Sequence, residues 1–156
     1  VFIVGAKRTP FGSFGGKLKD VGSVDLGKIS AQAAIAQSKI DPKLIESVTV
    51  GNIIQASQTN GGYISRHIAL GVGCGIEVPC LTVNRLCGSG FQAVVNCTQD
   101  IVLRDAEISL AVGSESMSQA PFVVSFQSKL NIKLLIDLTM VSCENLDLGS
   151  NLAKLL

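Results

Sequence analysis

The residue in this sequence best suited to covalent chemistry is Cys87, in the segment VNRLCGSGF at 83–91. A predicted strand at 80–84 ends just before it, and an apolar helical pattern begins just after it. A thiol at the start of a helix faces unpaired backbone N–H groups and the positive end of the helix dipole, which favour the thiolate. The thiolate is the nucleophilic form of cysteine, so the pattern predicts an activated nucleophile.

The glycines beside Cys87 fit the same interpretation. Gly88 and Gly90 allow the backbone and a substrate to approach each other closely. The arrangement is analogous to the nucleophile elbow of hydrolases, with sulfur in place of oxygen. The local pattern alone leaves an alternative open, a buried structural cysteine beside a glycine turn.

A second polar segment, GSESMSQAP at 113–121, follows a predicted strand at 108–112. It should therefore lie at the carboxyl edge of the sheet, where ligands bind in open α/β folds. The alternative, which the local pattern favours, is a polar loop that leaves the strand.

Two further features suggest functions that their context does not support. His67 is the single histidine and the obvious base for a cysteine nucleophile. It lies in an apolar helical pattern, however, where a lone histidine is more often a packed or surface residue.

The segment GSFGGK at 12–17 has neither phosphate-loop nor dinucleotide-loop spacing, and Leu18 stands where Ser or Thr is needed. We interpret it as a glycine-rich loop.

The composition predicts a folded domain without a nucleic-acid or membrane partner. The chain has 156 residues, of which 47% are hydrophobic and 16% charged, which is too apolar for disorder. The net charge of +1 and the 4% aromatic content argue against nucleic-acid binding. No apolar stretch reaches the roughly 18 residues that a membrane-spanning helix needs.

Strands and helices are predicted to alternate along the chain. Strands are expected at 1–5, 47–54, 80–84 and 108–112, and helices after Asp25 as N-cap, after Asp41, at 61–70 and at 88–104. The alternation predicts an α/β layered fold around a mostly parallel sheet. The apolar face of the helix at 88–104 comprises Phe91, Val94, Val95, Thr98, Ile101 and Val102, widened by Ala93 and Cys97.

The five cysteines do not form a metal or disulfide pattern. They stand at 74, 80, 87, 97 and 143, an odd number without a C-x-x-C pair. We therefore interpret the four other than Cys87 as small buried residues of a protein in a reducing compartment. The segment 125–156 differs from the rest in composition, because it is rich in Leu and has no glycine before Gly149. We expect it to need a partner surface that buries its leucines, so we place a boundary at 124.

Five segments together resemble the thiolase family. They are AKRTPFGSFGG (6–16), VGNIIQ (50–55), RHIALG (66–71), NRLCGSGFQA (84–93) and GSESMSQAPF (113–122). Their order and spacing fit an amino-terminal thiolase domain over 1–124, incomplete here, with 125–156 divergent or truncated. The sequence around Cys87 is most similar to that of 3-ketoacyl-CoA thiolases of the mitochondrial acetyl-CoA acyltransferase type. A ketoacyl synthase relative is disfavoured by the first and last of these segments.

The resemblance implies a fold, a reaction and a location. The fold is a five-layered αβαβα architecture built from two similar halves, assembled as a homodimer or homotetramer. The reaction is thiolytic cleavage of a 3-ketoacyl-CoA in fatty acid β-oxidation, in which Cys87 carries the acyl group as a thioester and its N–H helps form an oxyanion hole. Coenzyme A is a substrate, and no cofactor is implied. The implied location is mitochondrial, with cytoplasmic and peroxisomal locations open.

The sequence also departs from the family. Thiolases are more than twice as long, and their second half supplies a Gly-His-Pro histidine, a C-x-G cysteine and an N-E-A-F asparagine. His67 and Cys143 match none of these motifs. We therefore expect this chain alone to be poorly stable and nearly inactive. The alternative is a truncated, non-catalytic module that binds CoA or pairs with thiolase subunits.

Overall fold

Three parallel strands form the centre of the fold, in a computed structural model that describes residues 1–57 and 61–121. They are β1 (Ser47–Gly51), β2 (Cys80–Val83) and β3 (Ser109–Gly113), in the order β2-β1-β3. Gly51 is paired with Val83 on one side and with Gly113 on the other, so the three strands end at one edge. The predicted α/β fold with a parallel sheet is confirmed.

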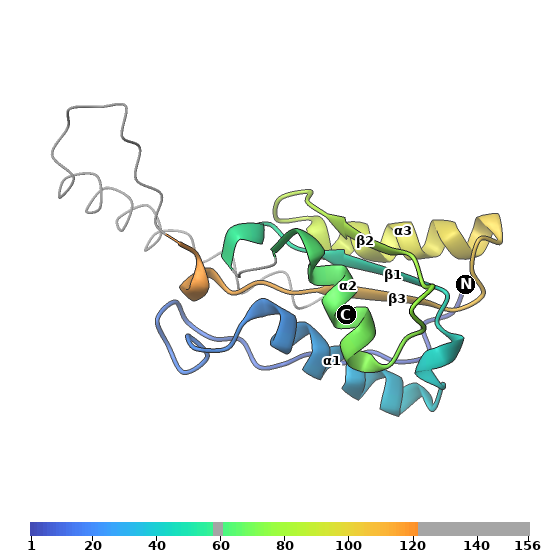
Figure 1. Ribbon diagram of the computed structural model, residues 1–156, viewed down its shortest axis with the longest axis horizontal. Coiled ribbons are helices and arrows are strands. Elements are labelled where there is room, and N and C mark those ends of the chain that lie inside the picture. The colour runs from blue at the N-terminus through green and yellow to red at the C-terminus, as the bar shows by residue number, and fades with distance from the viewer. Residues whose placement is uncertain (58–60, 122–156) are drawn as a thin grey trace, which may run out of the picture.

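Helices cover both faces of this sheet (Figure 1). Helix α3 (Ser89–Leu103) lies on one face, and α1 (Ser23–Ser38) and α2 (Ile64–Val72) lie on the other. The apolar core fills the space between the sheet and α1 and α2; its fully buried members include Val48, Val50, Val112, Ile64 and Ile68. Four short 3-10 helices complete the described elements: Pro42–Leu44, Gln55–Ser57, Gly61–Tyr63 and Met117–Gln119.

Helix α3 contacts the sheet through only part of the apolar face that its sequence predicts. Ala93 and Cys97 are buried, whereas Phe91 is 49% and Val102 67% exposed. The cause is close approach: a Cβ added to Gly51 of β1 would lie 2.4 Å from the carbonyl carbon of Ser89. Only small side chains fit between a helix and a sheet at that spacing. Among the larger apolar residues of α3, Val94, Val95 and Ile101 are half-buried and Phe91, Val102 and Leu103 are exposed.

The predicted buried strand at 1–5 is wrong. Phe2 is 91% and Ile3 81% exposed, and this segment is not a strand of the described sheet. It follows α1 instead: the Ala6 N–H donates to Gln37 Oε1 at 3.2 Å. Because it lies beside a helix, none of the described strands completes its backbone hydrogen bonds.

Several predicted boundaries shift by a few residues. Helix α1 starts at Ser23 with Gly22 as N-cap, so Asp25 is not the cap; it lies in the first turn, where its charge suits the helix dipole. Asp41 does cap the turn Pro42–Leu44, accepting from the Lys43 N–H at 3.0 Å. Helix α2 runs through Gly71 and ends at Val72, with Gly73, whose φ is +98°, as its C-cap.

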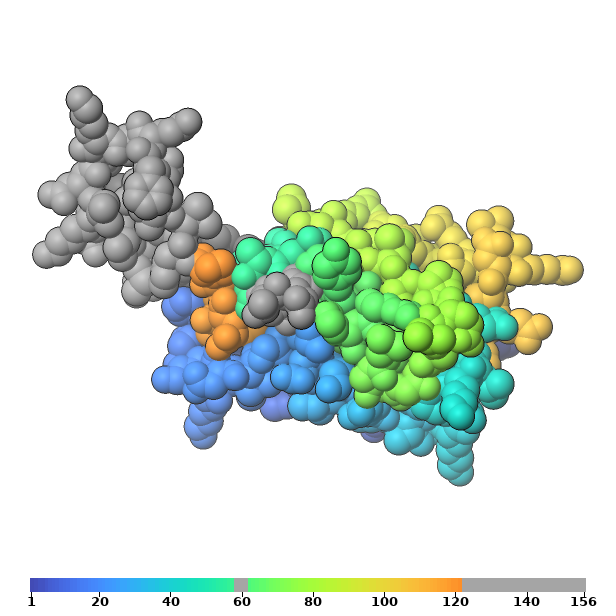
Figure 2. Space-filling view, viewed as in Figure 1, coloured from blue at the N-terminus to red at the C-terminus, as the bar shows by residue number. Residues whose placement is uncertain are grey.

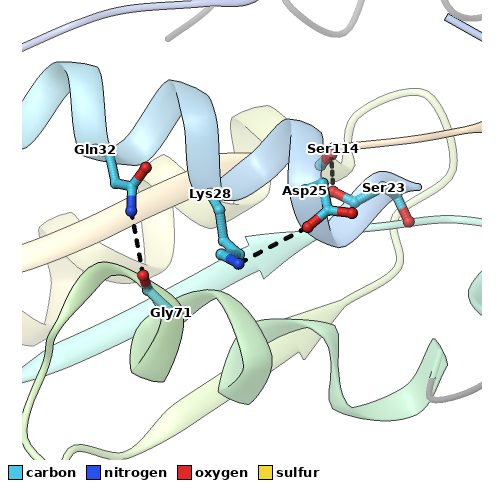
Figure 3. A network of polar contacts seen from close by, with 6 residues as sticks. All are labelled: Ser23, Asp25, Lys28, Gln32, Gly71 and Ser114. Carbon is cyan, nitrogen blue, oxygen red and sulfur yellow. Dashed lines mark hydrogen bonds and ion pairs between the residues drawn. The ribbon is translucent and has the colours of Figure 1, made fainter. Parts of the chain in front are cut away.

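Polar contacts fix α1 against its neighbours (Figure 3). Gln32 Nε2 of α1 donates to the carbonyl of Gly71 at the end of α2, 3.2 Å away. Ser114, just after β3, donates through Oγ to the Ser23 carbonyl at 2.6 Å. An ion pair of 3.8 Å joins Lys28 and Asp25 on the surface of α1. The Ser114 bond holds the start of α1 beside the end of β3, and the Gln32 bond holds α1 against α2.

The loop before α1 also packs against the residues that follow β3. In the space-filling view, the early residues in blue adjoin the orange residues that end the described chain (Figure 2). The Gly15 N–H donates to Ser118 Oγ at 3.0 Å, and Gln119 Nε2 donates to the Lys19 carbonyl. Residues 125–156, for which the sequence predicts a partner-dependent element, lie outside the described residues.

Candidate active site

Cys87 lies in the turn that joins β2 to α3, with its side chain exposed. The turn is tight because the Gly88 N–H donates to the Arg85 carbonyl at 3.1 Å and the Ser89 N–H donates to the Leu86 carbonyl at 3.0 Å. All strands end at this edge, so the thiol stands at the carboxyl edge of the sheet. The predicted location of Cys87 at a strand–helix turn is confirmed.

Leu86 gives this turn an unusual backbone conformation. Its φ is +49°, a left-handed value that costs a residue with a side chain about 1–2 kcal/mol. Two side chains hold the conformation. Asn84 Oδ1 accepts from the Leu86 N–H at 3.0 Å, and Ser89 Oγ accepts from the Arg85 N–H at 2.8 Å while donating to the Leu86 carbonyl at 2.6 Å. Neither Asn84 nor Ser89 was predicted from the sequence as a site residue, although Asn and Ser side chains commonly hydrogen-bond to turn backbone.

The start of α3 matches the sequence expectation in part. Gly88 is the N-cap and has no side-chain cap, and the positive end of the helix dipole lies at this turn. However, the N–H groups of Gly88 and Ser89 donate within the turn itself. Fewer backbone donors are therefore free to face the thiol than the sequence pattern suggests.

Glu115 brings a carboxylate to the same edge. Its Oε2 accepts from the Ile53 N–H at 2.7 Å, and its Oε1 accepts from the Ile54 N–H at 3.1 Å and from Asn52 Nδ2 at 3.3 Å. Burial raises the pKa of this carboxyl above its usual range, although these hydrogen bonds act in the opposite direction. The predicted position of the segment 113–121 at the carboxyl edge is confirmed, and Glu115 binds the loop that follows β1.

The other sequence candidates do not join this site. His67 is exposed on α2, and within the described residues no hydrogen bond links it to Cys87. The glycine-rich segment 12–17 forms turns, with Gly15 at a φ of +66°. Among the described residues, no group of three or more His, Cys, Asp and Glu side chains could hold a metal ion.

The described cysteines differ in exposure. Cys74 and Cys97 are buried, Cys80 is half-buried, and Cys87 is exposed; all four are free thiols. Burial raises the pKa of Cys74 to about 11 and also raises the pKa of Cys97, so both remain protonated at neutral pH. Cys143 lies outside the described residues. Within the described part of the chain, Cys87 is therefore the thiol most accessible to a substrate.

Comparison with known proteins gives the family. A family model described as the thiolase N-terminal domain matches residues 1–146, which extends past our predicted boundary at 124. The "3-ketoacyl-CoA thiolase, mitochondrial" of Pongo abelii is 50% identical over 139 residues, covering 86% of this chain and 35% of that protein. The human protein of the same name is 51% identical over 124 residues, covering 80% and 31%. This chain thus spans about a third of the length of the curated relatives it matches.

Solved structures agree with the sequence match. The crystal structure of human mitochondrial 3-ketoacyl-CoA thiolase in complex with CoA superimposes with a TM-score of 0.77 at 45% identity, covering 84% of this chain and 35% of that one. The Acat5 thiolase from Ascaris suum in complex with coenzyme A gives a TM-score of 0.76 at 35% identity, covering 81% and 33%. No helix in the described ranges is both long and apolar enough to cross a membrane. On its fold and on its match over residues 1–146, this chain belongs to the thiolase family.

Proposed function

We propose that this chain forms the nucleophile-bearing part of a 3-ketoacyl-CoA thiolase, with Cys87 as the residue that accepts the acyl group. The observation that carries the proposal is the exposed thiol of Cys87 at the strand–helix turn, at the start of α3. The similarity to mitochondrial 3-ketoacyl-CoA thiolases at about 50% identity supports the choice of reaction. The same similarity supports a mitochondrial location and a role in fatty acid β-oxidation.

The proposed chemistry has two steps. The Cys87 thiolate attacks the keto carbon of a 3-ketoacyl-CoA, and the bond between C2 and C3 breaks. The electron pair of that bond stays on C2, which takes a proton, so that acetyl-CoA leaves and the shortened acyl group remains on sulfur. The thiolate of free CoA then attacks this thioester and regenerates Cys87. Covalent capture divides a difficult C–C cleavage into two easier steps.

The described residues supply only part of what the reaction needs. The leaving carbon requires a proton donor and CoA must be deprotonated, yet within the described residues no acid or base hydrogen-bonds Cys87. We therefore propose that the chain alone forms the thioester slowly and does not turn over repeatedly. Full activity would require the family's second half, in an assembly of two or four chains.

A non-catalytic module is the second candidate, and one observation favours it. Phe91 near the start of α3 and Val102 and Leu103 at its end are between 49% and 70% exposed, and exposed apolar surface of this kind is what a binding partner would cover. A chain of this kind would bind CoA or pair with thiolase subunits without forming a thioester.

Release of acetyl-CoA distinguishes the two candidates. The 156-residue chain would be incubated with 3-ketohexanoyl-CoA without free CoA, and acetyl-CoA would be measured by chromatography over several hours. The thiolase proposal predicts release of up to about one equivalent per chain, because the acyl group cannot leave Cys87 without CoA. The Cys87→Ser variant should release none, and Cys80→Ser should match the wild type. Equal release by wild type and Cys87→Ser would refute the role of Cys87.

A further inference from the structure

Glu115 organises the loop that follows β1. Its carboxylate accepts three hydrogen bonds, from the backbone N–H groups of Ile53 and Ile54 and from the side chain of Asn52, at 2.7, 3.1 and 3.3 Å. Asn52 is 1% exposed, and its Nδ2 also donates to the Ser114 carbonyl at 3.0 Å. Glu115 thereby fixes the backbone at 52–54 to the end of β3.

A second set of hydrogen bonds continues from this loop to the Cys87 turn. Asn84 Nδ2 donates to the Ile53 carbonyl at 3.2 Å, and Asn84 Oδ1 accepts from the Leu86 N–H at 3.0 Å. Leu86 is the residue with a φ of +49° directly before Cys87. The peptide unit between Ile53 and Ile54 bonds to Glu115 through its N–H and to Asn84 through its carbonyl. Together with the Asn84 side-chain amide, it connects the Glu115 carboxylate to Leu86, the residue before Cys87.

Glu115 itself is fixed from the opposite side. Its two neighbours are serines whose hydroxyl groups donate toward the start of α1: Ser114 Oγ to the Ser23 carbonyl at 2.6 Å, and Ser116 Oγ to the Val21 carbonyl at 3.0 Å. Side chains alternate in direction along an extended segment, so anchoring residues 114 and 116 on one side directs Glu115 to the other. Figure 3 shows the first of these anchors, between Ser114 and Ser23.

We propose that Glu115 and Asn84 are positioning residues that hold the Cys87 turn in its reactive geometry through the Ile53 peptide. The proposal rests on the function proposed for Cys87. A carboxylate suits this position because it offers only acceptors to its three donors. Gln at position 115 would place an NH₂ group against at least one N–H and lose that hydrogen bond. Neither residue needs to touch substrate for this role.

The test measures the reactivity of Cys87 in the whole 156-residue chain. Each cysteine would be alkylated with iodoacetamide, and its rate would be followed by peptide mass spectrometry, with Cys80 as internal reference. The variants are Glu115→Gln, Asn84→Ala and the two combined. Glu107→Gln is the matched control, because it removes one carboxylate from an exposed side chain before β3, at the opposite edge of the sheet.

We expect Glu115→Gln and Asn84→Ala each to slow alkylation of Cys87 by about three- to tenfold, the effect of losing about one net hydrogen bond. Because both act through one connection, the double variant should be no slower than the single ones. Amide hydrogen exchange at Leu86 should accelerate in Glu115→Gln, although no hydrogen bond joins these two residues directly. Glu107→Gln should change neither readout.

Two outcomes separate failure of this inference from failure of the proposed function. If wild-type Cys87 reacts no faster than Cys80, the proposed nucleophile is wrong. If wild-type Cys87 is fast and both variants match it, or react faster as loss of a negative charge alone would cause, the positioning role is overturned. If Glu115→Gln exposes the buried Cys74 and Cys97, the variant has unfolded, and Asn84→Ala, at an exposed residue, decides the question.

Discussion

Gly51 of β1 and Ser89 of α3 are in backbone contact. A Cβ added to Gly51 would lie 2.4 Å from the Ser89 carbonyl carbon and 2.6 Å from the Gly90 nitrogen. Rotation of a side chain cannot relieve these contacts, because the atoms of Ser89 and Gly90 that the Cβ would meet belong to the main chain. The contact sets the position of the α3 start, and Cys87 lies two residues before Ser89.

Gly51→Ala should therefore displace the start of α3. We expect a loss of about 1–3 kcal/mol in the free energy of unfolding, as for other overpacked sites, together with slower alkylation of Cys87. Urea unfolding and iodoacetamide labelling would measure the two effects. Gly62→Ala is the control, since no atom of the described residues lies within 4 Å of a Cβ at that position. Wild-type stability in Gly51→Ala would show that α3 can move without cost.

A second close contact joins α1 to α2. A Cβ on Gly27 would lie 2.4 Å from Cδ1 of Ile68, which is fully buried. Gly27→Ala should destabilise the fold by about 1–3 kcal/mol, whereas Ile68→Val removes the Cδ1 atom that causes the clash. The double variant should then lose less stability than the sum of the single variants. Thermal unfolding of all four proteins measures this coupling, and strict additivity would contradict the contact.

Stability should fall in alkaline solution because of the buried thiols. Burial raises the pKa of Cys74 from 9.0 to about 11 in the folded chain. Between these values the unfolded chain has lost the proton and the folded chain keeps it, so the folded state binds more protons. Stability therefore decreases as pH rises through this window, by at most about 1.4 kcal/mol per pH unit for one thiol.

The check is urea unfolding at a series of pH values from about 8 to about 10.5, in wild type and Cys74→Ala. The variant should show a shallower decline, because it lacks one of the titrating thiols; Cys97 continues to contribute to the slope. Identical slopes in the two proteins would show that Cys74 ionises equally in both states. Cys87→Ala provides a cysteine control at an exposed position.

The sequence predicts the sheet and the Cys87 turn because both depend on local signals. Apolar strand segments and glycines mark the ends of β2 and the start of α3, and the family segments place Cys87 between them. It does not predict that the small residues Ala93 and Cys97 are the buried members of the α3 face, because that depends on Gly51 of a distant strand. The hydrogen bonds that Glu115 accepts from residues 52–54 are likewise set by strand register, which brings segments 61 to 63 residues apart to one edge.

The error at residues 1–5 has a related cause. An apolar segment indicates burial but not the partner that buries it. Here the segment follows α1, and Phe2 and Ile3 remain exposed. The resemblance to thiolases, by contrast, is confirmed by the match over residues 1–146.

The most direct test of the account is to locate the acyl group. The 156-residue chain would be incubated with excess hexanoyl-CoA, digested at mildly acidic pH to preserve thioesters, and analysed by peptide mass spectrometry. We predict a hexanoyl thioester on Cys87 that is absent from Cys87→Ser and is released by added CoA, with Cys74, Cys80 and Cys97 unmodified. A chain with no adduct, or with Cys80 acylated as readily as Cys87, would contradict the assignment of Cys87 as the nucleophile.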